Sequence, residues 1–257
     1  MNLITSRDNP LIKALRRLIQ DSTGYRKAGQ FWLEGDHLCR AAVERGVLPL
    51  HAVMTESFWA EQGAQWGHLS DQVILMPDAL FSSLSGLESP ARMGFVVALP
   101  AQSALLSDAS TVVLDRLQDA GNVGAILRCA SAFGYRQVLA IKGTAALWSP
   151  KVLRAGMGAH FGLHLVESVS QSDVSLLQVP VLTTSSHEGP FLHELLRRGD
   201  LPSRCAWVFG HEGQGVSASL MALSQQKVRI AQPGGEESLN VATAAAICLH
   251  ASSTAVI

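Results

Sequence analysis

The sequence predicts an α/β protein whose second part is a parallel β-sheet with helices on both faces, preceded by a smaller α/β unit. Three observations lead to this fold class. After residue 110, short apolar runs typical of buried parallel strands alternate with helical segments. Residues 100–110 are small and polar, as in a linker. Before them, shorter strands and helices also alternate. We therefore expect a first domain at 1–100, a linker at 101–110 and a second domain at 111–257.

The first part opens with a predicted amphipathic helix. Asn9 can cap its start, Pro10 suits its first turn, and apolar residues recur at helical spacing up to Ile19. Gly24 ends this segment. The expected elements that follow are a strand at 31–33, a helix at 36–46, and strands near 52–54, 73–75 and 94–98 separated by short helices.

The second part repeats the strand–helix pattern more strongly, which favours a doubly wound sheet. Ligand sites on such sheets lie at the carboxyl ends of the strands. Strands are expected at 111–115, 137–142, 163–167, 179–184, 205–209 and 227–230, and helices at 122–133, 150–156, 172–177, after Ser217 and from about Asn240.

The composition is that of a packed protein, with 47% hydrophobic and 16% charged residues. No apolar run approaches the length of about 18 residues that a membrane span requires, and residues 1–10 lack the apolar core of a secretory signal. We therefore expect a cytoplasmic protein. The four cysteines (Cys39, Cys129, Cys205 and Cys248) are scattered in apolar surroundings, so we expect them to be buried and reduced.

The formal net charge is −1, which disfavours binding by general neutralisation of phosphates. Any nucleic-acid surface must therefore be local. The first 30 residues contain six basic and two acidic residues, so they carry a local positive excess. This excess suits either an ordinary solvated helix face or a surface that touches phosphates. The basic residues are Arg7, Lys13, Arg16, Arg17, Arg26 and Lys27.

Three glycine-rich polar segments directly follow predicted strands. In the first, Gly121 allows a tight turn, Asn122 can cap a helix, and Arg128 lies within reach of the same end of the sheet. The second contains three glycines within six residues, Gly210, Gly213 and Gly215, around Glu212. Glu212 can accept hydrogen bonds from loop amides or be a solvated loop acid.

The third segment, residues 230–241, enters an alanine-rich helix. Gly234 and Gly235 offer exposed backbone groups, and both Ser238 and Asn240 are good helix caps. Capping alone would account for either residue, so a role in binding is one of two readings.

Other catalytic patterns are absent from the sequence. It has no Gly-x-Ser-x-Gly elbow, no P-loop lysine and no His-Glu-x-x-His motif. The second segment has the order Gly-x-x-Gly-x-Gly, the reverse of the dinucleotide fingerprint, which disfavours an NAD site. His160 and His164 are expected on one face of a strand, too isolated to bind a metal, so we expect no metal site.

At the three segments the sequence resembles the SpoU/TrmH family of RNA 2′-O-ribose methyltransferases, within the SPOUT superfamily. The first segment is similar to the family motif Asn-x-Gly-x-x-x-Arg at Asn122–Arg128, and the second to Gly-x-Glu-Gly-x-Gly at Gly210–Gly215. The third matches Ser-Leu-Asn-Val at Ser238–Val241. More loosely, residues 1–100 resemble the small RNA-binding domain often attached to these enzymes.

The resemblance implies a deep trefoil knot in the second domain, a homodimer, and S-adenosylmethionine as the methyl donor. It implies catalytic roles for Asn122, Arg128, Glu212, Ser238 and Asn240. It also implies RNA contacts by the six basic residues near the N-terminus. The implied cofactor-binding residues are Thr183, Gly210, Glu212, Gly213, Ile230, Ser238 and Leu239.

The resemblance implies methylation of an RNA 2′-hydroxyl, with ribosomal RNA favoured and transfer RNA as the alternative. Arg128 would act either as the base or as a clamp on a substrate phosphate. Two other function classes are a non-catalytic RNA-binding protein of the same fold and a nucleotide-binding metabolic enzyme on an ordinary doubly wound sheet. Binding of S-adenosylmethionine and of RNA would separate these possibilities.

Overall fold

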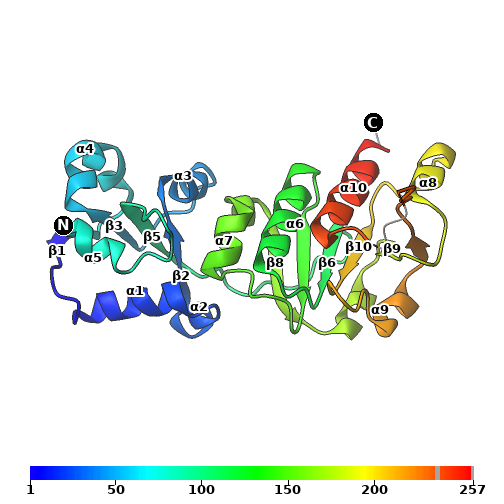
Figure 1. Cartoon of the computed structure of the whole chain (residues 1–257), viewed down its shortest axis with the longest axis horizontal. Coiled ribbons are helices and arrows are strands. Elements are labelled where there is room, and N and C mark those ends of the chain that lie inside the picture. The colour runs from blue at the N-terminus through cyan, green and yellow to red at the C-terminus, as the bar shows by residue number, and fades with distance from the viewer. Residues whose placement is uncertain (235–237, 256–257) are drawn as a thin grey trace. The chain divides into compact units, whose positions relative to one another are not determined.

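The computed structural model describes residues 1–234 and 238–255 (Figure 1). The chain divides into two compact units. The first unit contains Met1–Ala101 and Trp148–Phe161, and the second contains Gln102–Leu147 and Gly162–Ile257. The segment Trp148–Phe161, which lies within the expected second domain, is thus grouped with the first unit.

The first unit is built on a mixed five-stranded sheet in the order β1-β4-β3-β5-β2. Strand β5 runs antiparallel to both β2 and β3, whereas β4 runs parallel to β1 and β3. The strands are β1 (Asn2–Leu3), β2 (Gln30–Glu34), β3 (His51–Thr55), β4 (Val73–Met76) and β5 (Met93–Ala98). The helices of residues 1–101 are α1 (Pro10–Gln20), α2 (Gly24–Ala28), α3 (Asp36–Glu44), α4 (Glu56–Trp66), the 3₁₀ turn η1 (Gly67–Leu69) and α5 (Asp78–Ser82).

Helix α1 begins as its sequence predicts, but it ends at Gln20, and Gly24, the expected end of the segment, is instead the first residue of α2. The Asn9 side chain accepts a hydrogen bond from the Leu11 amide at 2.9 Å, and Pro10 occupies the first turn. Ile12, Leu15 and Leu18 are buried at helical spacing, which leaves the basic residues on the opposite side.

Helix α7 (Pro150–Gly156) packs on strand β2 of the first unit. The Ser149 side chain caps it, accepting a hydrogen bond from the Val152 amide. The rings of Trp148 and Phe31 lie 4.7 Å apart between centroids. These apolar contacts explain why this segment is grouped with residues 1–101.

The second unit contains a six-stranded sheet in the order β11-β9-β10-β6-β7-β8, and every pairing is parallel. The parallel sheet predicted from the sequence is therefore confirmed. Its strands are β6 (Thr111–Asp115), β7 (Gln137–Ile141), β8 (His164–Val169), β9 (Val181–Thr184), β10 (Ala206–Gly210) and β11 (Gln226–Val228). Its helical segments are α6 (Ala120–Ala132), η3 (Gln171–Leu176), α8 (Leu192–Arg198), α9 (Ala218–Leu223) and α10 (Val241–Thr254).

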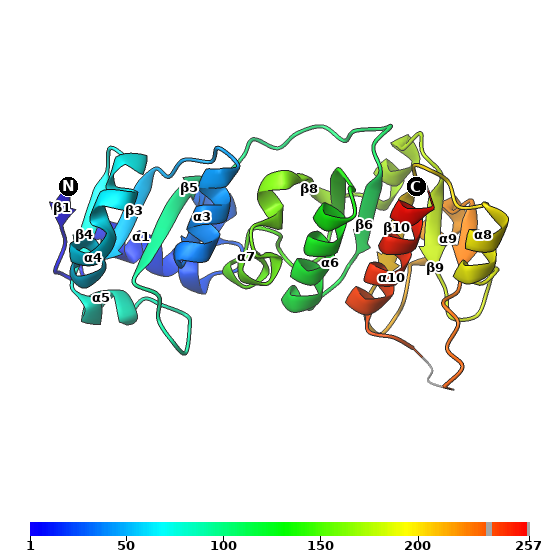
Figure 2. The same ribbon diagram turned by 90° about the horizontal axis from the view of Figure 1, so that it is seen from above.

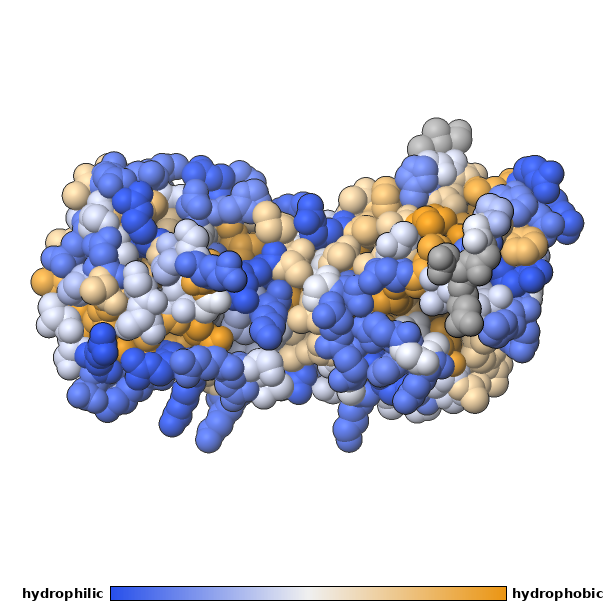
Figure 3. Space-filling model, in the orientation of Figure 1, coloured by the Kyte–Doolittle hydropathy of each residue, from blue (hydrophilic) through white to orange (hydrophobic). Residues whose placement is uncertain are grey.

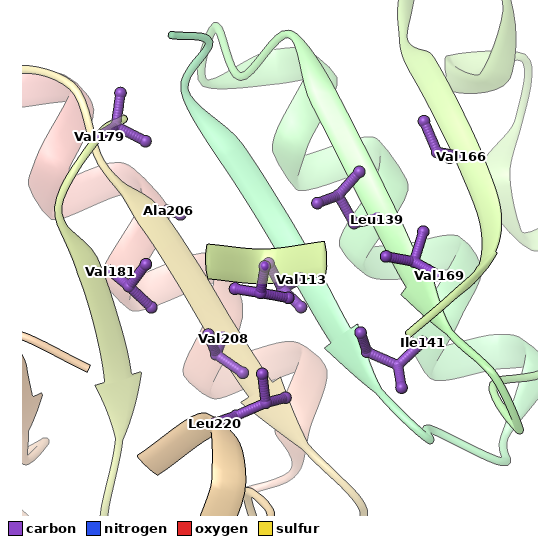
Figure 4. Packing of buried hydrophobic residues seen from close by; sticks show 11 residues of the cluster. Val113, Leu139, Ile141, Val166, Val169, Val179, Val181, Ala206, Val208 and Leu220 are labelled. Carbon is purple, nitrogen blue, oxygen red and sulfur yellow. The ribbon is translucent and has the colours of Figure 1, made fainter. Parts of the chain in front are cut away.

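Helical segments cover both faces of this sheet (Figure 2). On one face, branched apolar side chains of the central strands pack against Val174 of η3 and Leu220 of α9 (Figure 4). On the other face, α10 packs along α6 and against β10. The small residues of both helices allow this close approach. Strand β6, which directly precedes the first polar segment, therefore lies in the middle of the sheet and is buried on both sides.

Some sequence expectations are wrong in detail. Helix α8 was not anticipated, and residues 171–176 form a 3₁₀ segment rather than an α-helix. His160 does not share a strand with His164: it lies in the 3₁₀ turn Ala159–Gly162 (η2), within the first unit. A turn forms there because Met157 and Gly158 both adopt positive φ, which interrupts extended backbone.

The cysteine prediction holds for three of the four residues. Cys39, Cys205 and Cys248 are buried free thiols, whereas Cys129 is only half-buried. Burial raises the pKa of all four thiols, which disfavours the reactive thiolate. None of the helices in the described ranges combines the length with the apolar character that a membrane span requires.

Candidate functional site

The first polar segment connects β6 to α6 at the carboxyl end of the sheet. The sequence suggested Asn122 as the helix cap, but the cap is Asp119, whose side chain accepts a hydrogen bond from the Asn122 amide at 2.7 Å. Helix α6 therefore begins two residues before Asn122. The Asn122 side chain therefore does not cap α6.

Glu212 joins the second polar segment to the first. Its carboxylate accepts hydrogen bonds from the backbone amides of Gln118 and Asp119, each at 3.1 Å. It also accepts one from Asn122 Nδ2 at 3.2 Å. The structure therefore favours the reading in which Glu212 accepts hydrogen bonds from loop amides over that of a solvated loop acid. These amides belong to the neighbouring β6–α6 connection.

Asn240 brings the third segment to the same place. As the N-cap of α10, its Oδ1 accepts hydrogen bonds from the amides of Ala242 and Thr243. Its Nδ2 donates to Asn122 Oδ1 at 3.0 Å. Capping and a site contact are thus combined in one residue. Glu212, Asn122 and Asn240 form a continuous hydrogen-bonded chain across three segments that are far apart in the sequence.

These hydrogen bonds hold Glu212 in its charged form. Partial burial alone would raise its pKa, but hydrogen bonds from its own backbone amide, from those of Gln118 and Asp119, and from the Asn122 side chain outweigh burial. The pKa of Glu212 is therefore lowered. At neutral pH this residue is an anionic anchor and not a proton donor.

The loop that carries Glu212 is tightly closed. The Gly215 amide donates to the His211 carbonyl at 2.8 Å, and Gly215 adopts a φ of +67°. A Cβ on Gly210 would lie 2.1 Å from both the carbonyl carbon of Gly215 and the nitrogen of Val216. Only glycine fits at position 210, because the crowding atoms belong to the backbone.

The other predicted site residues are placed less closely together. Arg128 lies on α6 with an exposed side chain, six residues beyond Asn122. Ser238 is exposed and precedes Asn240 by two residues. Thr183 is fully buried in β9, and its hydroxyl donates to Ser224 Oγ at 3.0 Å. Gly235, named among the sequence candidates, lies outside the described residues, as do its neighbours 236 and 237.

The six basic residues of the first unit lie on or near α1 and α2. All are exposed except Arg16, which is half-buried. Lys13 pairs with Asp8 at 3.2 Å in a solvent-exposed contact. Figure 3 shows a hydrophilic surface along these two helices. Their arrangement is compatible both with an ordinary solvated helix face and with a surface that touches phosphates.

The motifs do not include Asp115 and Arg116, which the structure places beside the second segment. Asp115 is fully buried, and its carboxylate accepts hydrogen bonds from the Ser217 amide and from Arg116 Nε. A charged residue at the end of the apolar run Thr111–Asp115 was the available signal.

This end of the sheet fits the cofactor that the resemblance implies. Gln232 Oε1 is buried and has no hydrogen-bond partner among the described residues, so it can accept from a ligand. Two apolar residues lie near Gln232 in the sequence: Leu239, whose side chain is 37% exposed, and Ile230, which is half-buried. Acceptors beside apolar side chains suit an adenosine group. No group of three potential metal ligands occurs among the described residues.

Comparison with known proteins agrees with these observations. The sequence profile of the SpoU rRNA Methylase family matches residues 109–250. That of the MRM3-like substrate binding domain matches residues 9–94. An uncharacterised tRNA/rRNA methyltransferase from Synechocystis is 34% identical, over 96% of this chain and 92% of the relative. The 23S rRNA (guanosine(2553)-2′-O)-methyltransferase RlmP of Bacillus subtilis is 28% identical, over 97% and 98%.

Solved structures show the same fold over nearly the whole chain. A protein from Porphyromonas gingivalis, described as an RNA methyltransferase of the TrmH family, is similar with a TM-score of 0.83 and 29% identity. The match covers 95% of this chain and 97% of that one. An RNA 2′-O ribose methyltransferase is similar with a TM-score of 0.80 and 28% identity, over 99% of both chains.

The family expected from the three motifs is therefore confirmed, and with it S-adenosylmethionine as the cofactor. The chain belongs to the SpoU rRNA methylase family and is an S-adenosylmethionine-dependent RNA methyltransferase.

Proposed function

We propose that this protein methylates a ribose 2′-hydroxyl in ribosomal RNA, with Asn122, Arg128, Glu212, Ser238 and Asn240 as its catalytic residues. The observation that carries the proposal is the hydrogen-bonded chain of Glu212, Asn122 and Asn240 at the carboxyl end of the sheet. The full-length similarity to RlmP, a 23S rRNA 2′-O-methyltransferase, supports both the ribose and the ribosomal substrate. Because DNA lacks the 2′-hydroxyl, this chemistry also requires an RNA substrate.

S-adenosylmethionine supplies an electrophilic methyl group on a sulfonium. The protein must align the attacking oxygen with that group and provide for loss of the hydroxyl proton. Asn122 is held from both sides, by Glu212 and by Asn240, so its amide is fixed in one orientation. This rigid arrangement and the neighbouring Ser238 would position the ribose.

Arg128 would hold the substrate phosphate rather than act as the base. Its exposed guanidinium is available to an RNA chain. A guanidinium stays protonated in proteins, whereas its planar donors suit two phosphate oxygens at once. A phosphate oxygen held in this way can accept the proton as the oxygen–methyl bond forms.

The cofactor would be bound by the second and third segments, at Gly210, Glu212, Gly213, Ile230, Ser238 and Leu239, with the backbone near Thr183. The compact Gly210–Gly215 loop and the unpartnered Gln232 Oε1 support this assignment. Glu212 would brace the site from behind, because its carboxylate is already occupied by the β6–α6 connection.

The two matched profiles support separate roles for the two domains. Residues 1–100 would bind RNA through Arg7, Lys13, Arg16, Arg17, Arg26 and Lys27, and residues 111–257 would carry out methyl transfer after the linker at 101–110. The match of residues 9–94 to a substrate-binding domain supports the first role. The hydrophilic surface along α1 and α2 suits phosphate contacts (Figure 3).

The active form would be a homodimer with a trefoil knot in the second domain. The apolar surface over α10, where Ile247 is 38% exposed, supports a partner at this helix (Figure 3). The return of the chain from edge strand β11 to α10, which packs on α6 in the middle of the sheet, supports the threading. A cytoplasmic location remains a prediction.

The test is transfer of labelled methyl from S-adenosylmethionine to unmodified ribosomal RNA and transfer RNA, offered separately. We expect label at a 2′-hydroxyl of ribosomal RNA. Label in transfer RNA only would assign the alternative substrate. Cofactor binding without transfer to naked RNA or to ribosomal particles would contradict the proposed reaction, and failure to bind the cofactor would favour a non-catalytic RNA-binding protein.

A further inference from the structure

The loop that carries Glu212 is tied to the β6–α6 connection at a second point. Asp115, the last residue of β6, accepts a hydrogen bond from the Ser217 amide through Oδ2 at 2.7 Å. Its other oxygen, Oδ1, accepts one from Arg116 Nε at 2.9 Å. Ser217 is the residue at which the loop ends and α9 begins. One buried carboxylate therefore serves the loop on one side and Arg116 on the other.

Arg116 holds an unusual backbone conformation. Its φ is +59°, in the left-handed region that side chains disfavour. Neighbouring groups maintain it: the Arg116 amide donates to Thr144 Oγ1 at 3.1 Å, and its carbonyl accepts from Gln118 Nε2 at 3.0 Å. Strained residues of this kind persist where the surrounding structure determines them, and they concentrate at functional sites.

The strained conformation turns the side chain back toward the loop. Arg116 Nη1 donates to Gln214 Oε1 at 3.4 Å, while Nε remains on Asp115. The Asp115 side chain is fully buried and that of Arg116 is 32% exposed. A buried carboxylate requires a partner that compensates its charge, and this arginine provides it. The guanidinium thus bridges a fixed point of the sheet and the Gly210–Ser217 loop.

We infer that Arg116 is a positioning residue for cofactor binding: together with Asp115 it holds residues 214–217 in place before the ligand enters. The inference rests on the proposed role of this loop in the cofactor site. Glu212 anchors the first half of the loop and the Asp115–Arg116 pair anchors the second. An ordered loop binds a ligand more tightly, because less conformational freedom is lost on binding.

The test is titration calorimetry of the full chain with S-adenosylmethionine alone. Arg116→Gly removes the guanidinium and leaves a residue that adopts the left-handed conformation without strain. Arg116→Lys keeps the charge and loses the planar donors. Arg204→Ala, at an exposed position of the same unit, is the control. We expect Arg116→Gly to raise Kd about tenfold, with Arg116→Lys intermediate, the control unchanged and one site per chain throughout.

Wild-type affinity in Arg116→Gly would overturn the inference. A reduced number of binding sites per chain, each with wild-type affinity, would also overturn it. That result would mean that the substitution lowers only the folded fraction and leaves the affinity of the folded molecules unchanged. If Arg116→Gly folds poorly, Asp115→Asn must raise Kd in its place, and unchanged affinity there refutes the inference. A wild-type protein that binds no S-adenosylmethionine would instead refute the cofactor site itself, and the inference with it.

Discussion

The most sharply defined perturbation is a methyl group at Gly210. A Cβ there would lie 2.1 Å from the carbonyl carbon of Gly215 and from the nitrogen of Val216, and 2.4 Å from the Gly215 oxygen. Ordinary contacts of a Cβ begin at 3.4 Å, so the opposite side of the loop must move by more than 1 Å. The obstructing atoms are backbone, and no rotation of a side chain relieves the clash.

The magnitude follows from this geometry. Overpacking that forces backbone shifts costs about 1–3 kcal/mol, and we place Gly210→Ala at the upper end, about 2–3 kcal/mol, because the neighbours are rigid. For a protein of this size the corresponding decrease in Tm is about 4–12 °C. Displacement of Gly215 and Val216 also moves the loop that carries Glu212, so we expect weaker binding of S-adenosylmethionine.

The assay compares thermal unfolding by circular dichroism with calorimetric cofactor binding. Gly213→Ala is the matched control for stability, because a Cβ at position 213 meets its nearest neighbours, two ring atoms of His211, at 3.9 Å. We expect a Tm near that of the wild type for this control. A Gly210→Ala protein with wild-type Tm and cofactor affinity would refute the close packing of the loop.

Three further outcomes are expected. Arg128→Ala should abolish methyl transfer and leave the Kd for S-adenosylmethionine within about twofold, since the lost contact is with RNA; a fully active variant would remove Arg128 from the mechanism. Glu212→Gln should lower Tm at pH 7 but not at acid pH. Folding lowers the pKa of Glu212, so the contribution of its carboxylate to stability is present above about 4.3, the unfolded pKa. That contribution is lost as pH falls through the folded pKa. Equal differences at pH 7 and pH 4 would contradict this. Arg17→Ala combined with Lys27→Ala should raise KM for RNA and flatten its salt dependence with kcat unchanged, and an unaltered salt dependence would assign both residues to a solvated helix face.

Much of the fold was predictable because its local signals are strong. The Asn9–Pro10 start of α1 and the buried run Thr111–Asp115 each combine a favourable cap or a continuous apolar pattern with the expected element. Helix α8 was missed because it is short and follows a Gly-Pro pair, which reads as a loop. The 3₁₀ form of residues 171–176 depends on local hydrogen bonds that apolar spacing does not distinguish from an α-helix.

The residues of the candidate site were predictable from the sequence, but the contacts between them were not. The motif spacing singled out Asn122, Glu212 and Asn240, yet it suggested a helix cap for Asn122 that Asp119 in fact provides. Asp115 and Arg116 were not singled out, because their importance depends on a left-handed φ and on a loop about 100 residues away.

By itself, the sequence determined the parallel sheet, the order of the three polar segments and, through their motifs, the family. The sheet and the order of the segments follow from local periodicity and residue type, which can be read along one stretch of chain, whereas the family follows from the resemblance of the motifs to known ones. Only the tertiary structure decided that Glu212 serves the amides of another loop, that Asn240 reaches Asn122, and that helix α7 packs with the first unit. Such contacts depend on which strands become neighbours, and burial then makes each polar group take the partner that the fold brings to it.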